Sequence, residues 1–259
     1  CVPSKTLLHS ARLAHTVRGD LRRLQEAGIT VDPKAVQVDF EKIMERVRKI
    51  RGQISHHDSA ERYSKELGVE VYIGRGKFTS EKTVEVNGRT LTFKRAAIAT
   101  GGYPTLIPMD GLKELYEEAT WGPKSPDTPR PIVMTNETIF NLTKAPKIMA
   151  VIGAGVIGME MAQAMQRLGV DTIVLGRSGR VLAKEDADLA NNVQRQMTDE
   201  GVEFCLNVGE YQKIEKTGRT LDNGYPELKL TFQERGKEEP TLLICDALLV
   251  AAGRRPNVT

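Results

Sequence analysis

Cysteine and aromatic residues are both scarce in this sequence of 259 residues, and each scarcity excludes a class of protein. There are three cysteines, at positions 1, 205 and 245. This number is low, and an odd number cannot pair completely, so a small secreted domain held by disulfides is excluded and we expect a reducing, cytoplasmic location. Aromatic residues make up 5% of the chain and do not alternate with basic clusters, as a base-stacking surface would require. The net charge of +3 is also small, and we expect no nucleic-acid partner.

Long apolar stretches are missing as well. The longest stretch without a charged residue, 96–109, contains two glycines and two prolines and is too short to span a bilayer, so we expect no membrane partner. No cysteines or histidines have metal-ligand spacing, and we expect no metal site. What is present is a composition of 40% hydrophobic and 27% charged residues, typical of a globular protein, and a length that suits roughly two domains.

Hydrophobic periodicity gives the first part of the chain two helices and several strands. Apolar residues recur every three or four positions over 4–27 and 39–67, with Asp39 as a predicted N-cap and Gly68 as a stop. Alternating apolar residues then predict short strands, with a hairpin turn at Asn87-Gly88. These strands are expected at 69–73, 83–86, 91–93 and, fully buried, 96–99.

The second part has the pattern of a nucleotide-binding unit. A buried strand at 148–152 is followed by a glycine turn, a helix at 156–168 and a strand at 172–175. Further strands are predicted at 202–206, 228–232 and 242–251. Strands that alternate with helices predict an α/β, Rossmann-like fold.

The glycine turn reads Gly153-Ala154-Gly155-Val156-Ile157-Gly158 and lies between a strand and a helix, as in a dinucleotide-binding fingerprint. Gly153 would allow the tight turn, Gly155 would let a pyrophosphate approach the backbone, and Gly158 would let the helix pack close to the strand. The first N–H groups of the helix would face the phosphates. The plainer alternative is a glycine-rich turn without a ligand.

The end of the second strand indicates which dinucleotide the unit prefers. An NAD site usually carries an acidic residue there for the ribose 2′-hydroxyl. Here Gly176 takes that place, and Arg177 and Arg180 follow it. Guanidinium groups suit a 2′-phosphate, so the sequence favours NADP, with NAD as the alternative; both arginines could also be ordinary surface residues.

The three cysteines fall into two kinds of context. Cys1 opens the segment CVPSK immediately before the first predicted helix. The partial positive charge at the N-terminus of a helix favours the thiolate form of a cysteine there. Cys205 and Cys245 lie in apolar strand contexts, and we interpret both as buried, unreactive core residues.

With these motifs in this order, the sequence resembles the class I pyridine nucleotide–disulfide oxidoreductases. Besides CVPSK and VIGAGVIGMEMA, the resemblance rests on Ala99-Thr100-Gly101, Thr135-Asn136-Glu137 and AGRRPN at 252–257. HDSAERY in the second helix and MTNETIF before the glycine motif are similar to the mercuric-reductase-like branch.

The resemblance implies a flavoprotein enzyme, a homodimer that passes electrons from NADPH through FAD to a redox-active disulfide and on to a disulfide or metal-ion substrate. Cys1 matches the second redox cysteine, and it is the predicted catalytic residue. Lys5 and Glu160 match a pair beside the flavin, and Val156 stands where some relatives carry a gating tyrosine. The other matched positions are cofactor contacts: Gly76, Thr100 and Gly101 for FAD, and Gly153, Gly155, Val156, Ile157, Gly158, Arg177, Arg180 and Gly253 for the nicotinamide nucleotide.

The resemblance also predicts that the chain is a central fragment. The family's first redox cysteine, its FAD glycine motif and its dimer domain have no counterpart here, so we expect the chain alone to hold FAD poorly and to be inactive. The predicted parts are a partial FAD domain at 1–119, a linker or insertion with a return strand at 120–146, an NAD(P) domain at 147–252 and the start of a return at 253–259. The alternatives are an NAD-linked dihydrolipoamide dehydrogenase and a non-catalytic dinucleotide-binding module.

Overall fold

A five-stranded parallel sheet forms the centre of the molecule in the computed structural model, which describes residues 1–19, 21–121 and 131–258. Its strand order is β5-β12-β6-β7-β8, and every neighbouring pair is parallel. The strands are β5 (Val133–Met134), β6 (Ile148–Ile152), β7 (Asp171–Leu175), β8 (Glu203–Cys205) and β12 (Ala247–Val250). Both faces of the sheet are covered, which is why β6 and β12 read as continuous apolar runs.

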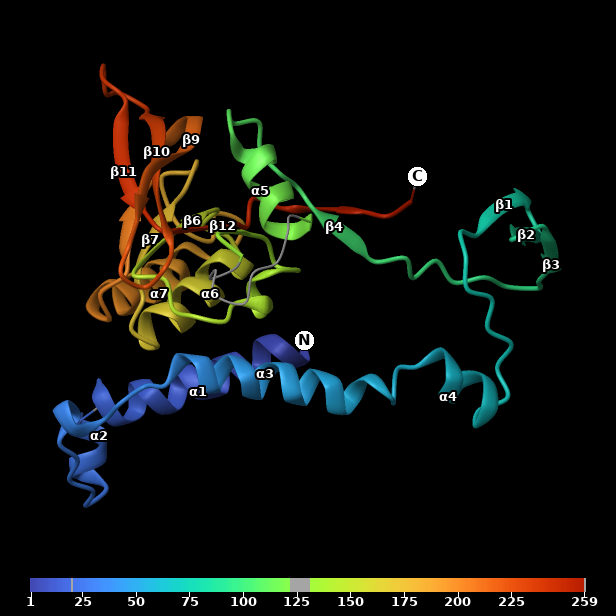
Figure 1. Ribbon diagram of the computed structural model, residues 1–259, viewed down its shortest axis with the longest axis horizontal. Coiled ribbons are helices and arrows are strands. Elements are labelled where there is room, and N and C mark those ends of the chain that lie inside the picture. Colours follow the sequence, from blue (N-terminus) through green and yellow to red (C-terminus); the bar gives the residue numbers. More distant parts are fainter. Residues whose placement is uncertain (20, 122–130, 259) are drawn as a thin grey trace.

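The two faces of this sheet carry different layers (Figure 1). Helices α6 (Val156–Arg167) and α7 (Ala187–Asp199) lie on one side, and a three-stranded antiparallel sheet lies on the other. That sheet consists of β9 (Val208–Thr220), β10 (Pro226–Glu234) and β11 (Thr241–Cys245). The α/β, Rossmann-like fold class predicted from the sequence is confirmed. The domain boundary predicted at 147 stays a prediction, although the parallel sheet already begins at Val133.

The single strand expected over 242–251 is wrong, because Asp246 divides it into β11 and β12. The carboxylate of Asp246 is fully buried and accepts hydrogen bonds from the backbone N–H groups of Lys147 and Ile148, both at 2.7 Å. It also accepts one from Nδ2 of Asn223 at 2.8 Å. These bonds hold the chain where it passes from the antiparallel sheet into the parallel one.

The first part of the chain is mainly helical and packs under α6 through α1. The helices are α1 (Val2–Arg18), α2 (Leu21–Glu26), α3 (Phe40–Ser55) and α4 (Ala60–Lys65), with 3₁₀ turns at Pro33–Ala35 and Ile139–Asn141 and a further helix, α5 (Leu112–Trp121). The predicted N-cap is confirmed, since Asp39 accepts from the Lys42 N–H at 3.0 Å.

Each of the two long helices predicted from periodicity is interrupted. The first ends at Arg18, where the Gly19 N–H donates to the His15 carbonyl at 2.7 Å. The second stops at Ser55 and restarts after Ser59, whose hydroxyl accepts from the Arg62 N–H. A side chain that caps the backbone locally competes with continuation of a helix. The spacing of apolar residues carries no information about such caps, so it did not predict the break.

The small antiparallel sheet lies apart from the rest of the molecule (Figure 1). Its strands are β1 (Lys77–Ser80), β2 (Thr83–Val86) and β3 (Arg89–Thr92), and the predicted turn is confirmed by positive φ at Asn87 and Gly88. A further pair joins β4 (Gly102–Pro104) to β13 (Arg254–Pro256).

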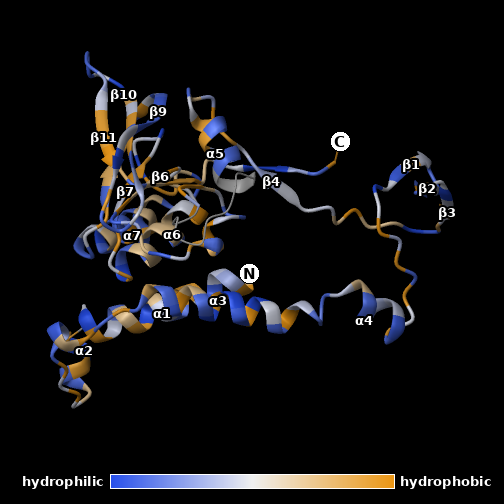
Figure 2. Ribbon diagram, in the orientation of Figure 1, coloured by the Kyte–Doolittle hydropathy of each residue, from blue (hydrophilic) through white to orange (hydrophobic). Residues whose placement is uncertain are grey.

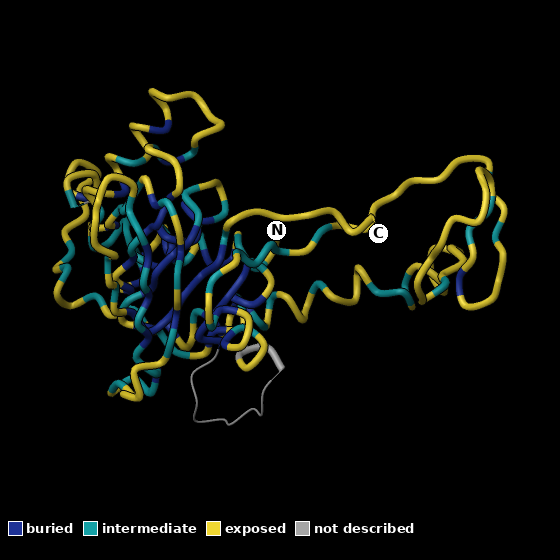
Figure 3. The backbone as a smooth tube through the Cα atoms, turned by 90° about the horizontal axis from the view of Figure 1, so that it is seen from above, coloured by how far each residue is buried: buried dark blue, intermediate teal, exposed yellow. Residues whose placement is uncertain are grey.

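The strands predicted at 69–73 and 96–99 do not form. Neither segment pairs with another strand among the described residues, and both are extended and exposed, contrary to the burial expected for 96–99 (Figures 2 and 3). Ile73 is 78% exposed and Ile98 65% exposed. Strand propensity alone cannot supply a partner, so the pattern is realised only where another strand lies alongside.

Of the linker or insertion with a return strand predicted at 120–146, residues 122–130 fall outside the described residues. The described remainder contains β5 and the 3₁₀ turn at Ile139–Asn141. In the part of the chain that the structure describes, none of the helices combines the length and the apolar character needed to cross a membrane.

Candidate dinucleotide and thiol site

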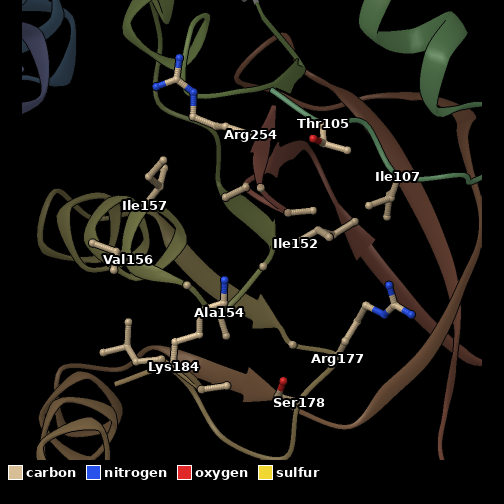
Figure 4. A pocket seen from close by; sticks show the side chains of 18 of the residues that line it. Thr105, Ile107, Ile152, Ala154, Val156, Ile157, Arg177, Ser178, Lys184 and Arg254 are labelled. Carbon is tan, nitrogen blue, oxygen red and sulfur yellow. The ribbon is translucent and has the colours of Figure 1, made fainter. Parts of the chain in front are cut away.

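A pocket of about 700 Å³ opens where β6 meets α6, at the carboxyl edge of the parallel sheet (Figure 4). Four chain segments far apart in sequence line it: 105–108, 152–157, 176–185 and 251–255, together with Tyr211. Ligands of open α/β folds bind at this edge, where the loops after the strands diverge. The pocket gathers most of the predicted nucleotide contacts, namely Gly153, Gly155, Val156, Ile157, Arg177, Arg180 and Gly253.

The three glycines of the motif occupy three different environments. Gly153 has φ +114°, and a Cβ there would lie 2.4 Å from the Ala251 carbonyl oxygen. A Cβ on Gly158, outside the pocket lining, would lie 1.9 Å from the Gly153 carbonyl oxygen, so this glycine lets α6 pack against the turn. Gly155 has no heavy atom within 4 Å of its would-be Cβ, which leaves open space before the first N–H groups of α6. This open space fits a pyrophosphate.

The two predicted arginines have different surroundings. Arg177 is exposed, lines the pocket and has no hydrogen bond or ion pair among the described residues. The guanidinium of Arg180 instead donates to three backbone carbonyls, those of Leu182 (3.2 Å), Ala183 (2.8 Å) and Glu185 (2.9 Å). Arg180 therefore holds the 182–185 loop, and Arg177 is the arginine whose donors face the pocket.

Sequence reasoning missed other residues that line the same pocket, among them Lys184 and Tyr211. Lys184 is exposed on the loop that Arg180 holds, and no hydrogen bond or ion pair to the described residues occupies its ammonium group. Tyr211 is buried and donates its hydroxyl to the Leu175 carbonyl at 3.1 Å; burial raises its pKa. Lys184 lies nine positions after Leu175, the last residue of β7, and the dinucleotide motif makes no prediction for a residue so far beyond the strand. Tyr211 comes from β9, a strand that the sequence pattern did not predict.

Val156 and Gly253 line the pocket from α6 and from the segment that leads into β13. Val156 is 63% exposed beside it, so no aromatic ring covers this position. On the opposite side Gly253 has φ +134°, and its carbonyl accepts from the Thr105 N–H at 3.0 Å. Arg254 donates to the Gly102 carbonyl, which fixes the two extended segments to each other.

Cys1 lies at the N-cap of α1 and is exposed. One turn later, the Lys5 ammonium lies 3.1 Å from Oε1 of Glu160 on α6. The pair that the sequence predicted is therefore formed, and it ties the thiol-bearing helix to the helix of the glycine motif. The structure does not bring Gly76, Thr100 or Gly101 to this site, because they lie on exposed extended chain. There Thr100 and Gly101 bond Asn257, and Gly101 has φ +68°.

The other two cysteines lie in the nucleotide unit. Burial raises the pKa of Cys245 to about 12, and burial together with the Glu234 charge raises that of Cys205 to about 11. Both thiols are therefore protonated near neutral pH. Cys245 is buried as predicted, whereas Cys205 is only partly buried, contrary to the expectation.

Comparison with known proteins adds the family to this geometry. The model of the pyridine nucleotide-disulphide oxidoreductases matches residues 1–259. The chain belongs to this family. A mercuric reductase of Lysinibacillus sphaericus is 30% identical over 99% of this chain and 41% of its own length. A dihydrolipoyl dehydrogenase of Acholeplasma laidlawii is 28% identical over 99% of this chain and 67% of its own length.

Solved structures agree on the fold. The HOCl-induced flavoprotein disulfide reductase RclA from Escherichia coli superposes with a TM-score of 0.70 at 21% identity, over 100% of this chain and 48% of that one. The chain spans about two fifths of the length of the mercuric reductases that it matches.

The family's two cofactors fit these residues unequally. The open turn at Gly155, the start of α6 and the pocket fit one nicotinamide dinucleotide. For FAD, the described residues do not enclose a second dinucleotide, since Gly76, Thr100 and Gly101 are exposed and far from a glycine turn of the β6–α6 kind. Among the described residues, no group of three or more His, Cys, Asp or Glu side chains is arranged to hold a metal ion.

Proposed function

We propose that this chain is the thiol-bearing and nucleotide-binding part of an FAD-dependent reductase that takes electrons from NADPH and passes them through a redox-active disulfide to a disulfide or metal-ion substrate. The observation that carries the proposal is Arg177, which faces the pocket unpaired at the end of β7, beside Gly176 and without a neighbouring carboxylate at the acidic position of NAD sites. The contact between Lys5 and Glu160 supports it, because it joins the Cys1 helix to the nucleotide unit.

The chain's own residues have separable tasks in this proposal. The bound nucleotide would supply a hydride, and the residues of the pocket would position it. The N–H groups of α6 bind the pyrophosphate over Gly155. The Arg177 guanidinium would hold the 2′-phosphate through charge-assisted hydrogen bonds. Arg180 holds the 182–185 loop, and Lys184 adds a second positive charge from it.

The test is a titration of the chain with NADPH and with NADH at one fixed ionic strength. We expect NADPH to bind more tightly by about 2 kcal/mol, some tens-fold, after allowance for the exposure of Arg177. Arg177→Gln should abolish most of this preference while leaving NADH affinity unchanged, and Lys184→Gln should lower it by a smaller factor. Arg195→Gln on α7 makes the same charge change outside the pocket and is the matched control.

Equal affinities in the unmodified chain would instead favour the NAD-linked dihydrolipoamide dehydrogenase alternative. Gly176→Glu would introduce the acidic residue of NAD sites, but the structure argues against it as a variant that inverts the preference. A Cβ at Gly176 would lie 2.8 Å from Cδ2 of Leu206 and 3.2 Å from Cβ of Ala154, so a glutamate there would disturb the strand end.

Two further parts of the proposal concern the longer protein. FAD and the homodimer are expected there, and light scattering together with the flavin absorbance of a protein extended at both ends tests them. A protein that binds NADPH but reduces no disulfide would favour the non-catalytic alternative.

A further inference from the structure

Leu182, in the loop that follows Arg180, has an unusual backbone conformation. Among the described residues, three that are not glycine have positive φ: Asn87 (+50°), Leu182 (+46°) and Asn207 (+62°). Asparagine adopts this left-handed conformation more readily than most residues, and Asn87 lies in a hairpin turn that requires it. Leucine avoids it, because its Cβ crowds the following carbonyl oxygen. Leu182 therefore keeps this conformation only because its surroundings hold it there.

Three hydrogen bonds hold the backbone of Leu182. Its N–H donates to the Ala154 carbonyl of the glycine turn at 2.8 Å. Its carbonyl accepts from the Arg180 guanidinium at 3.2 Å and from the Glu185 N–H at 2.8 Å. Its side chain is half-buried and packs against the core. The loop is thereby fixed to the glycine turn, and Lys184, two residues later, lines the pocket (Figure 4).

Lys184 depends on this anchor for its position. The residues that flank it are exposed, and its ammonium group has no hydrogen bond or ion pair to the described residues. Lysine carries its charge on a flexible four-carbon stem, so the charge spreads over a wide volume unless the backbone beneath it is fixed. The backbone at Leu182 therefore determines where this charge can meet a bound nucleotide.

We propose that Leu182 is a positioning residue for nucleotide recognition, whose left-handed backbone, bonded to the glycine turn, places the Lys184 ammonium against the 2′-phosphate of NADPH. The inference rests on the proposed function and deepens it. Discrimination between NADPH and NADH then comes from cations on two separate segments, Arg177 after β7 and Lys184 on this loop. Because the hydrogen bonds offset the strain before a ligand arrives, the loop does not have to be ordered when the nucleotide binds.

The experiment compares two substitutions of Leu182 whose effects should run against side-chain similarity. Leu182→Ile keeps an apolar side chain of the same volume, but a β-branched residue is strained at positive φ. Leu182→Gly removes the side chain and adopts this φ freely. We expect Leu182→Ile to lower the NADPH-to-NADH affinity ratio as much as Lys184→Gln does, roughly threefold to fivefold, the size of one close charge pair in water. Leu182→Gly should leave the ratio nearly unchanged, whereas a residue needed only for packing would give the opposite order.

Two further measurements connect Leu182 to Lys184. Leu182→Ile combined with Lys184→Gln should lower the ratio no further than Lys184→Gln alone, because the first residue acts through the second. Hydrogen exchange of the peptide 180–186 should show protection that is lost in Leu182→Ile and retained in Leu182→Gly. Leu189→Ile makes the same side-chain change at an exposed position of α7 outside the pocket and is the matched control.

The possible outcomes separate this inference from the proposed function. An unchanged ratio or retained exchange protection in Leu182→Ile would overturn the role of Leu182 and leave the proposed function intact. An equal fall of the ratio in Leu182→Gly or in Leu189→Ile would do the same. Equal affinities of the unmodified chain for NADPH and NADH would refute the proposed coenzyme, and the role of Leu182 along with it.

Discussion

At the scale of single residues, the glycine motif shows that identical residue types perform different physical tasks. Gly158 is needed for packing, because its Cβ position coincides with the Gly153 carbonyl. Gly155 instead leaves open space, because no described atom lies within 4 Å of its would-be Cβ, and this is where the proposed nucleotide would bind. The sequence predicted both roles from spacing alone, and the structure fits each of them.

These roles predict opposite outcomes for one substitution. Gly158→Ala should lower the free energy of unfolding by roughly 1–3 kcal/mol, since an added methyl group overpacks against backbone. Gly155→Ala should leave stability nearly unchanged, because the residue has φ −87° and open space, yet weaken NADPH binding at least several-fold. Urea unfolding and nucleotide titration of both variants measure this. Equal stabilities for the pair would contradict the packing argument.

The electrostatic residues were less predictable than the glycines. The sequence placed Arg177 and Arg180 together as phosphate ligands, but hydrogen bonds to three carbonyls commit Arg180 to its own loop. Whether an arginine bonds its own loop or stays available to a ligand depends on how the loop folds. The spacing of residues in the sequence does not predict this. The same holds for Arg46, whose guanidinium donates to the Thr6 carbonyl of α1 only because α3 packs beside α1.

At the scale of elements, one buried side chain connects two sheets. We expect Asp246→Ala to destabilise the protein by about 2–4 kcal/mol, because two backbone N–H groups and the Asn223 amide lose a charged acceptor in the interior. Asp222→Ala is the matched control. Asp222 pairs with Lys147 on the surface, and its loss should cost far less. Chemical denaturation ranks the two variants, and similar losses would contradict the assigned role of Asp246.

A second connection joins three helices around Glu200. Burial by itself would raise the pKa of this carboxyl, but the hydrogen bonds and charge of Arg167, with His15 nearby, outweigh it and hold the pKa below its ordinary value of 4.5. A carboxyl with a lower pKa in the folded state stabilises the protein above its unfolded pKa, and that contribution is lost as the pH falls through the folded pKa.

The expected result is that the free energy of unfolding falls as the pH drops below about 4.5, and that Glu200→Gln falls less steeply over the same range. Unfolding titrations at neutral pH and at about pH 3 test this. Parallel pH profiles for the two proteins would show that Glu200 does not contribute. Since His15 belongs to α1 and Arg167 to α6, the same variant would also loosen the attachment of the thiol helix.

The elements themselves were predictable to different degrees. Local patterns predicted the hairpin of β2 and β3, the Asp39 cap and the β6–α6–β7 unit, because each depends on neighbouring residues. The strands at 69–73 and 96–99 failed because strands need distant partners. β9 was not predicted, because its burial is set by packing on the parallel sheet and not by its own composition.

At the scale of the whole molecule, buried residues are unevenly distributed along the chain. Buried residues concentrate around the parallel sheet, while the segments that lead to and from β1–β3 are exposed (Figure 3). We expect backbone amides of 69–76 and 94–101 to exchange with solvent within the earliest time points, and those of β6 and β12 to be the slowest. Hydrogen-exchange mass spectrometry of the chain measures both. Strong protection of 69–76 would indicate a pairing partner that this arrangement lacks.

The position of β12 also determines when the nucleotide site can exist during synthesis. This strand lies between β5 and β6, yet the ribosome makes it only after β7 to β11. Until it emerges, the apolar edge of β6 is uncovered and the Gly153 turn has no Ala251 beside it. A nascent chain therefore carries the complete glycine motif without a pocket while residues 159–246 are made, and during that time the edge of β6 is open to pairing with another chain.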